Sequence, residues 1–348
     1  MTNNIKEKYL KAKRSLFDKY YGRMNDMQRS SVYTVNGPLL VLAGAGSGKT
    51  TVIVNRIANL IKYGKAYSSR EVAFEPSDRD IELMKEYLDG NEDALFDIED
   101  LLYDDPAKPW QILAITFTNK AANELKERLV NSLGEQGNDI WASTFHSACV
   151  RILRRFGDRI GYSSHFTIYD TDDSKRLIKE CQRQLDIKDS VLSHKTILNE
   201  ISRSKDCLIT PEEYIKEGAK DARMSRIGQV YKMYQEELKK ADAMDFDDMI
   251  VNTVRLLEDF PDVRDYYQRR FRYVMVDEYQ DTNHAQFRLT QLLAEGHQNI
   301  CVVGDDDQSI YRFRGATIEN ILSFEFQFRN AVTIRLEQNY RSTQTILD

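Results

Sequence analysis

Short apolar runs that end in polar residues recur along the chain, and longer stretches with helical spacing separate them. A short unbroken apolar run is typical of a strand buried on both faces, as in a parallel sheet. The runs cover residues 39–42, 111–116, 141–145, 273–276 and 300–303, with 332–336 as a further candidate. The pattern therefore predicts an α/β domain built on a parallel sheet.

Helices are predicted between these runs. Leu125, Leu129 and Leu133 follow one another at intervals of four residues, which places them on one face of a helix. Residues 25–35 and 51–61 also have helical patterns. From about residue 149 to residue 243 the pattern is helical almost throughout, without alternation of strand and helix. We therefore expect an all-helical subdomain inserted into the α/β domain.

The most specific motif directly follows the first apolar run. Residues 43–50 read A-G-A-G-S-G-K-T, which fits G-x-x-x-x-G-K-[ST] with alanine in place of the first glycine. A loop of this kind points backbone N–H groups at an anion, and the start of the next helix adds partial positive charge. Lys49 would reach the β- and γ-phosphates, and Thr50 would ligate Mg²⁺. The predicted ATP-binding residues here are Ala43, Gly44, Ala45, Gly46, Ser47, Gly48, Lys49, Thr50 and Thr51.

Polar residues follow the later runs, at the strand ends where a parallel sheet binds ligands. Asp277 and Glu278 come directly after the run 273–276. Asp277 is the candidate Mg²⁺ ligand, and Glu278 is the candidate base that activates the attacking water. Gln308 would sense the γ-phosphate, and Arg341 would place a guanidinium on it. Read alone, Gln308 and Arg341 fit ordinary loop positions better than catalytic ones.

Charge is unevenly distributed over the 348 residues. The formal net charge is −6, but residues 65–108 hold 14 acidic and 5 basic residues, which leaves +3 for the rest of the chain. We interpret 65–108 as an acidic surface insertion with helices near 81–88 and 94–102. A solvated excursion is favoured over a surface for docking a partner. The weakly basic body is compatible with a nucleic-acid partner.

Cysteine content and hydropathy exclude several classes of protein. The four cysteines form no CxxC pair, which favours buried free thiols over a metal site or a disulfide framework. The sequence has no apolar run of membrane-spanning length, and residues 1–19 lack the apolar core of a signal peptide. We therefore expect a cytoplasmic protein.

Short blocks of sequence stand in the order found in superfamily 1 DNA helicases of the UvrD/Rep/PcrA type, which the chain resembles. The blocks are 27–28, 43–50, 115–122, 143–147, 276–282, 304–315 and 336–342. The resemblance implies a RecA-like P-loop NTPase fold and an ATP-dependent DNA helicase or translocase that moves 3′→5′ in repair or replication, with ATP and Mg²⁺ as cofactors. It also implies that Gln28 reads the adenine edge and that Tyr340 stacks on the adenine ring.

The resemblance also implies a set of residues that bind single-stranded DNA. Bases would be contacted by Phe117, Tyr311 and Phe313, and the strand would lie near Asn119, His146 and Arg314. Residues 311–314 alternate aromatic rings with arginines, a combination that suits stacking on bases and contact with phosphates. Phe313 stands where the best-known members have Trp, and it offers a smaller ring. Core packing is the alternative for each aromatic residue.

Arginines cluster near the start of the predicted helical subdomain. They are Arg151, Arg154, Arg155 and Arg159. Contact with strand or duplex phosphates is one interpretation. A solvated helix face is slightly favoured over it.

The resemblance also suggests how the chain is divided. Residues 1–147 would form the first part of motor domain 1A, and 148–243 would form helical subdomain 1B. Residues 244–335 would complete domain 1A, and 336–348 would begin a second motor domain. Because family members continue further, we expect an N-terminal fragment that is monomeric, binds ATP and single-stranded DNA or its junctions with duplex, and unwinds nothing alone. No membrane partner is expected, and repair proteins are candidate partners.

Other classes of function fit parts of the pattern. The chain also fits the motor of an AddA/RecB-type helicase–nuclease, although residues 37–44 favour the UvrD-like branch. A non-catalytic nucleic-acid-binding or scaffolding module is a second alternative, and the intact Lys49, Asp277 and Glu278 argue against it. A P-loop ATPase acting on protein partners would leave the aromatic–arginine segment 311–314 unexplained.

Overall fold

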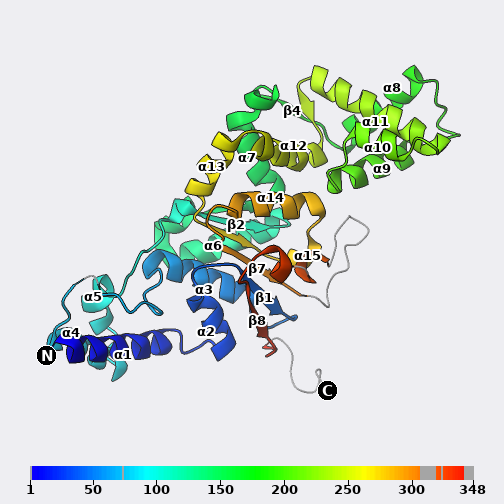
Figure 1. Cartoon of the computed structure of the whole chain (residues 1–348). Helices are drawn as coiled ribbons and strands as arrows, with labels where there is room; N and C mark the ends of the chain where they lie inside the picture. Colours follow the sequence, from blue (N-terminus) through cyan, green and yellow to red (C-terminus); the bar gives the residue numbers. More distant parts are fainter. Residues whose placement is uncertain (1, 73, 306–318, 323, 341–348) are drawn as a thin grey trace.

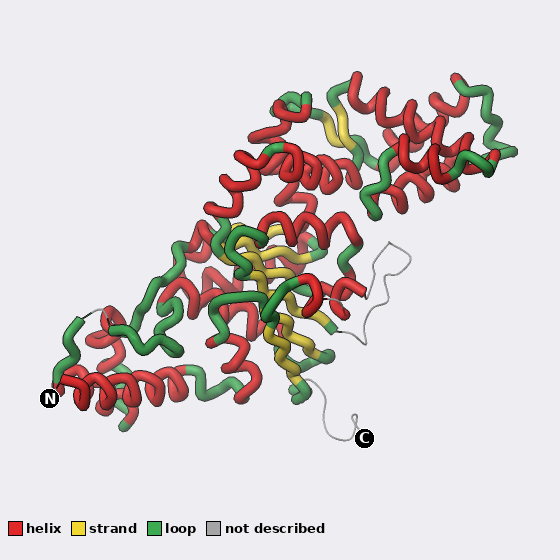
Figure 2. Tube along the Cα trace, in the orientation of Figure 1, coloured by secondary structure: helices red, strands yellow, loops and turns green. Residues whose placement is uncertain are grey.

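A six-stranded parallel sheet lies at the centre of the molecule (Figures 1 and 2). The computed structural model of the chain describes residues 2–72, 74–305, 319–322 and 324–340. The strand order is β3-β2-β6-β7-β1-β8, and all adjacent pairs run parallel. The strands are β1 (Leu39–Ala43), β2 (Ile112–Thr116), β3 (Trp141–Thr144), β6 (Tyr273–Val276), β7 (Ile300–Gly304) and β8 (Val332–Leu336). Each predicted apolar run is therefore a strand of one sheet.

Helices cover both faces of this sheet and create two cores. Successive residues of a strand point to opposite faces, so Val41 belongs to one core and Leu40 to the other. Leu125 and Leu129 are buried in the first core, as the helical spacing predicts. Residues of α2 (Asp26–Tyr33), α3 (Lys49–Lys62) and α6 (Asn119–Leu133) line the first core, and residues of α7 (Phe145–Phe156), α12 (Phe246–Asp259), α13 (Pro261–Arg270) and α14 (His284–Ala294) line the second.

A helical subdomain with its own core extends from one end of the molecule (Figure 1). It contains α8 (Thr171–Gln184), α9 (His194–Asp206), α10 (Pro211–Glu217) and α11 (Ala222–Lys240). The short pair β4 (Thr167–Ile168) and β5 (Ala243–Met244) joins its beginning to its end. The predicted range 148–243 also includes most of α7, but the buried residues of that helix belong to the second core of the sheet.

The acidic segment forms a folded lobe at the opposite end of the molecule. Its helices α4 (Asp78–Leu88) and α5 (Ala94–Ile98) lie beside the N-terminal helix α1 (Thr2–Tyr20) (Figure 1). Ile81 and Met84 of α4 are buried together with Phe17 of α1. The interpretation as a merely solvated excursion is therefore wrong for one face of the segment, because apolar residues at helical spacing are packed there.

Short helices complete the connections between the described elements. They are η1 (Glu99–Leu101), η2 (Pro109–Gln111), η3 (Gly134–Asp139), η4 (Gly157–Ile160), η5 (Tyr279–Asp281), α15 (Glu319–Leu322) and α16 (Phe324–Gln327). Among the described residues, none of the helices is both long and apolar enough to cross a membrane. Cys149, Cys181 and Cys301 are buried free thiols, as predicted, whereas Cys207 is exposed because it directly follows the last residue of α9.

Candidate functional site

The loop between β1 and α3, residues 44–48, is the predicted anion cradle. Gly46 and Gly48 have φ values of 77° and 88°, in the left-handed region that favours glycine. A Cβ atom on Gly48 would also lie 2.7 Å from Nε2 of Gln28. Ser47 closes the loop, since its Oγ donates to the carbonyl of Gly44 at 2.7 Å. The glycines are therefore required here, and α3 begins with its free backbone N–H groups beside the loop.

Lys49, the first residue of α3, faces the carboxylates that follow β6. Its Nζ lies 3.1 Å from Oε2 of Glu278, which has a left-handed backbone with φ of 50°. The same Oε2 accepts a hydrogen bond of 2.8 Å from Nε2 of Gln280. Oε1 of Gln280 in turn accepts from the backbone N–H of Asp305 at 3.0 Å. Gln280, which the sequence analysis assigned no role, thus links Glu278 to the chain that leaves β7.

Asp277 has the surroundings of a cation ligand. Burial, together with the charge of Glu278, raises the pKa of Asp277 to about 6. A nearby cation would offset both effects, because it stabilises the ionised carboxylate. Thr50, Asp277 and Glu278 line one cavity, and hydroxyl and carboxylate oxygens are the ligands that Mg²⁺ prefers. The residues present at this end of the cavity therefore fit Mg²⁺.

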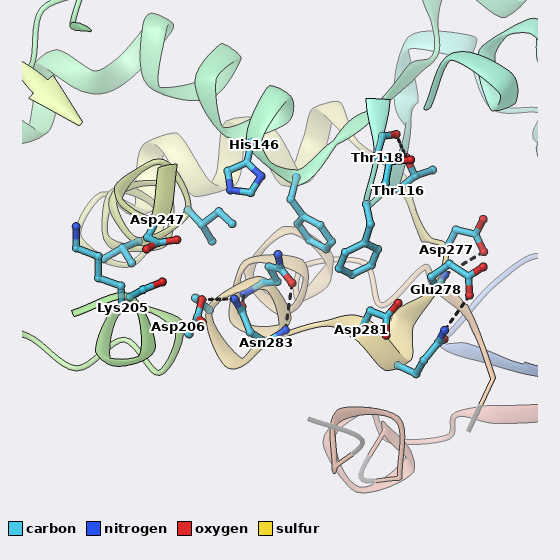
Figure 3. Close-up of a pocket in the computed structure, with 18 of the residues that line it drawn as sticks. Thr116, Thr118, His146, Lys205, Asp206, Asp247, Asp277, Glu278, Asp281 and Asn283 are labelled. Atoms are coloured by element: carbon cyan, nitrogen blue, oxygen red, sulfur yellow. Dashed lines mark hydrogen bonds between the residues drawn. The ribbon is translucent and has the colours of Figure 1, made fainter. Parts of the chain in front are cut away.

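This cavity, of about 1000 Å³, extends from the carboxylates to the helical subdomain (Figure 3). Phe117, Phe145 and His146 line its middle. Phe145 is buried in the second core of the sheet, whereas Phe117 is only half-buried, with its ring centre 5.5 Å from that of Phe145. Phe117 and His146 thus share a cavity with the predicted nucleotide residues, and Phe145 is a core residue.

Phe246 is an aromatic residue beside the cavity that the sequence analysis missed. It is the first residue of α12, its side chain is half exposed, and its ring centre lies 5.8 Å from that of His146. Burial lowers the pKa of His146 and favours its neutral form. An exposed aromatic ring beside a neutral imidazole suits stacking on a base. Its only sequence signal is a Phe directly after the helix-capping Asp245.

Charged side chains hold the far end of the cavity together, where the helical subdomain meets α12. Nζ of the buried Lys205 lies 2.6 Å from Oδ2 of Asp245 and 2.8 Å from Oδ1 of Asp248. Burial lowers the pKa of Lys205, but the two carboxylates outweigh it and the pKa is raised. Nearby, Nδ2 of Asn283 donates to Oδ1 of Asp206 at 2.5 Å, which joins the loop after Glu278 to α9.

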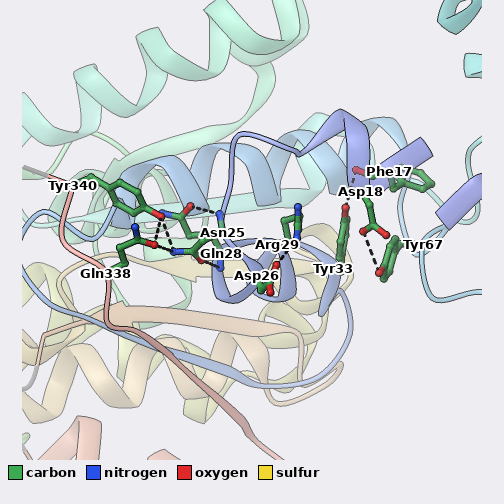
Figure 4. Close-up of polar contacts among 10 residues, drawn as sticks. All are labelled: Phe17, Asp18, Asn25, Asp26, Gln28, Arg29, Tyr33, Tyr67, Gln338 and Tyr340. Atoms are coloured by element: carbon green, nitrogen blue, oxygen red, sulfur yellow. Dashed lines mark hydrogen bonds and ion pairs between the residues drawn. The ribbon is translucent and has the colours of Figure 1, made fainter. Parts of the chain in front are cut away.

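The segment that follows β8 returns to the anion cradle (Figure 4). The backbone N–H of Tyr340 donates to the carbonyl of Gly46 at 2.9 Å. Asn25 connects the two predicted adenine-binding residues, because its Nδ2 donates to the hydroxyl of Tyr340 and its Oδ1 accepts from the backbone of Gln28, both at 2.8 Å. Gln28 is buried and donates to the carbonyl of Ser47 at 2.9 Å. The half-exposed ring of Tyr340 therefore lies beside the cradle.

Comparison with known proteins identifies the family. The model of the UvrD/REP helicase N-terminal domain matches residues 24–74 and 97–329. The chain belongs to the UvrD/REP helicase family. It is similar to ATP-dependent DNA helicase PcrA of Bacillus subtilis, with 46% identity over 326 residues that cover 93% of the chain and 38% of that protein. Proteins of the same name from Staphylococcus epidermidis and Staphylococcus aureus are each 45% identical over 325 residues, or 93% of the chain and 39% of the relative.

Membership of the UvrD/REP family confirms the resemblance. It does not test the roles predicted for individual residues. Gln308, Tyr311, Phe313, Arg314 and Arg341 lie outside the described residues. Thr51 and Asn119 are exposed at the starts of α3 and α6, and neither is among the residues that line the cavity. Their roles stay predictions.

Proposed function

We propose that this chain carries the ATP site and the single-stranded DNA site of an ATP-dependent DNA helicase. One observation carries the proposal: Thr50, Asp277 and Glu278 line the same cavity as Phe117 and His146. A nucleotide and a DNA strand would then bind close together and contact loops that line the same cavity. Relatives named as ATP-dependent DNA helicases support this assignment, although the chain spans only about two-fifths of their length.

At the nucleotide end, the cradle would bind the phosphates and the carboxylates would serve hydrolysis. Lys49 would bind the β- and γ-phosphates, which compete with Glu278 for its ammonium group. Thr50 and Asp277 would hold Mg²⁺, which neutralises phosphate charge when bound. Glu278 would accept a proton from the attacking water, with its carboxylate oriented by Gln280. Gln28 and Tyr340 would receive the adenine beside Asn25.

At the DNA end, aromatic rings would bind bases with little sequence preference. Phe117 and Phe246 would stack on bases, and His146 would lie against the strand. The predicted contacts of Tyr311, Phe313 and Arg314 belong to the same proposal. Movement in the 3′→5′ direction and a role in repair or replication rest on the resemblance to UvrD-like helicases. We assign to the chain itself the binding of ATP and DNA, and we assign strand separation to a protein of the relatives' full length.

Equilibrium binding of a fluorescent ATP analogue tests the nucleotide site. With Mg²⁺ present, Lys49→Ala should weaken binding by roughly 10- to 100-fold, since a charge-assisted contact contributes about 1.5–3 kcal/mol. Lys62→Ala is the matched control, because Lys62 ends the same helix and lies 3.8 Å from Glu99. Equal loss in both variants, or none in Lys49→Ala, would contradict the proposal. The chain should show no unwinding of a tailed duplex.

A further inference from the structure

Three arginines lie over aromatic rings beside β3, outside the cavity. The guanidinium carbon of Arg151 is 3.8 Å from the centre of the Trp141 ring, and that of Arg270 is 5.3 Å from the same ring. Arg155 lies 4.6 Å from the ring centre of Tyr266. These residues come from α7 and α13, which lie close together in Figure 1. We call this set of three arginines the arginine patch.

The arginine patch concentrates positive charge without carboxylate partners. Among the described residues, none of the three takes part in an ion pair or a side-chain hydrogen bond. Their neighbours in α7 and η4 (Gly157–Ile160) differ: Arg154 donates to the carbonyl of Ser164 at 2.9 Å, and Arg159 pairs with Asp262 at 2.9 Å. Two like charges on one indole repel each other, so the patch would be stabilised by an anion.

Stacking prepares these side chains for phosphate. A guanidinium is planar and carries its N–H groups at the edge of the plane, so one that lies over a ring still has donors that suit the two oxygens of a phosphate. Arg151 and Arg155 are exposed and Arg270 is half-buried, so solvent reaches these edges. Less conformational entropy is lost on binding, because the stacked side chains are already ordered.

The arginine patch lies a short distance from the cavity along the edge strand. β3 is the outermost strand of the sheet, and the residue that follows its last residue is Phe145, which lines the cavity. Trp141 at its start is about 13 Å from Phe145 along the strand, at roughly 3.3 Å per residue. Trp110, which is 40% exposed, is also near Arg270, with 5.9 Å between guanidinium carbon and ring centre. Arginines beside an exposed indole resemble a platform for single strands.

We propose that Arg151, Arg155 and Arg270 form a second contact for single-stranded DNA, which binds the phosphates of the strand after it leaves the cavity past β3. Trp110 would stack on a base at this contact. The proposal rests on the proposed DNA site in the cavity and extends it by a separate surface. It assigns Arg154 and Arg159 to the fold, because Arg154 already bonds the carbonyl of Ser164 and Arg159 already pairs with Asp262.

Oligonucleotides of two lengths test the proposal. A strand of about 8 nucleotides would fill the cavity alone, whereas one of about 20 nucleotides would also reach the patch. In R151Q/R155Q/R270Q, affinity for the long strand should fall about tenfold or more, and affinity for the short strand should stay within about twofold. Three lost phosphate contacts should also lower the slope of log affinity against log salt by roughly 2 for the long strand.

Two further variants separate binding from folding. R176Q/R183Q/R223Q removes the same charge from exposed positions of the helical subdomain that do not line the cavity, and it should leave both affinities unchanged. R151K/R155K/R270K keeps the charge but loses the planar fork, so it should retain part of the long-strand affinity. Equal loss for both strands, or loss confined to duplex DNA, would overturn the proposal. Failure of the wild-type chain to bind the short strand would instead contradict the proposed function.

Discussion

The two ends of the cavity are built in different ways. At the nucleotide end, one loop and its neighbours supply the chemistry: Gly48, Lys49 and Thr50 are consecutive, and Asp277 and Glu278 are adjacent. At the helical end, side-chain contacts join α9 to residues far along the chain: Lys205 contacts Asp245, which directly precedes Phe246 of α12, and Asp206 contacts Asn283. Local sequence therefore determines the first end, whereas packing between subdomains determines the second. Substitutions at the helical end should therefore affect stability and DNA binding more strongly than they affect nucleotide binding.

The largest expected effect is at the buried charges that join the subdomains. Lys205→Met leaves Asp245 and Asp248 buried without their cation, which typically costs about 3–5 kcal/mol. We expect the free energy of unfolding, measured with urea, to fall by this amount. The backbone amides of α9 and α11 should lose their protection from hydrogen exchange early. Lys216→Met on the exposed side of α10 is the matched control and should change stability by less than about 0.5 kcal/mol. A similar small change in Lys205→Met would remove the proposed difference between the two ends.

The next effect concerns DNA at the helical end. Phe246→Ala should weaken binding of a short oligonucleotide by about 1–3 kcal/mol, because one stacking platform is lost. Binding of the ATP analogue should not change. Phe96→Ala is the control, since Phe96 is 80% exposed and lies in the acidic lobe. Fluorescence anisotropy measures both variants, and an equal effect in the two would exclude a local role for Phe246.

A smaller effect is expected where the two ends communicate. Gln280→Ala removes the hydrogen bonds to Glu278 and to the backbone of Asp305. The separate affinities for ATP analogue and oligonucleotide should change little, but the effect of one ligand on the other should fall by about 1 kcal/mol. The exposed Gln136→Ala should leave this coupling intact. Calorimetric titration of each ligand, with and without the other, measures it.

The smallest effect is a pH dependence at the junction of α9 with the loop after Glu278. Burial, together with the charge of Asp247, raises the pKa of Asp206 from 3.8 to about 7. The folded state therefore holds a proton that the unfolded chain releases, so this group makes the protein less stable as pH rises from about 4 to 7. Asp206→Asn removes this loss of stability. The free energy of unfolding of the variant should therefore rise by about 1 kcal/mol relative to wild type between pH 5 and pH 8. Asp158→Asn should show no such trend in urea unfolding.

The sheet was predicted correctly, and the residues of the proposed nucleotide end were singled out, because both correspond to local patterns in the sequence. The nucleotide-binding role of those residues stays a prediction. Buried strands appear as unbroken apolar runs, and the cradle appears as glycines before Lys49. The contact of Gln280 with Asp305 could not be predicted, because it joins residues 25 positions apart across the sheet. The exposure of Phe246 could not be predicted, because the local sequence does not distinguish an apolar residue that packs inward from one that faces solvent. The packing of the acidic lobe was not predicted, because the interpretation relied on its many charged residues and not on the apolar residues along one face of α4.

The central claim is that nucleotide and single-stranded DNA bind next to each other in one cavity. The most direct measurement is the affinity of the wild-type chain for an ATP analogue with Mg²⁺, with and without a saturating short oligonucleotide. The account predicts that the oligonucleotide changes this affinity by about 5- to 150-fold, and that the analogue changes oligonucleotide affinity by the same factor. Two affinities that do not depend on each other would contradict it.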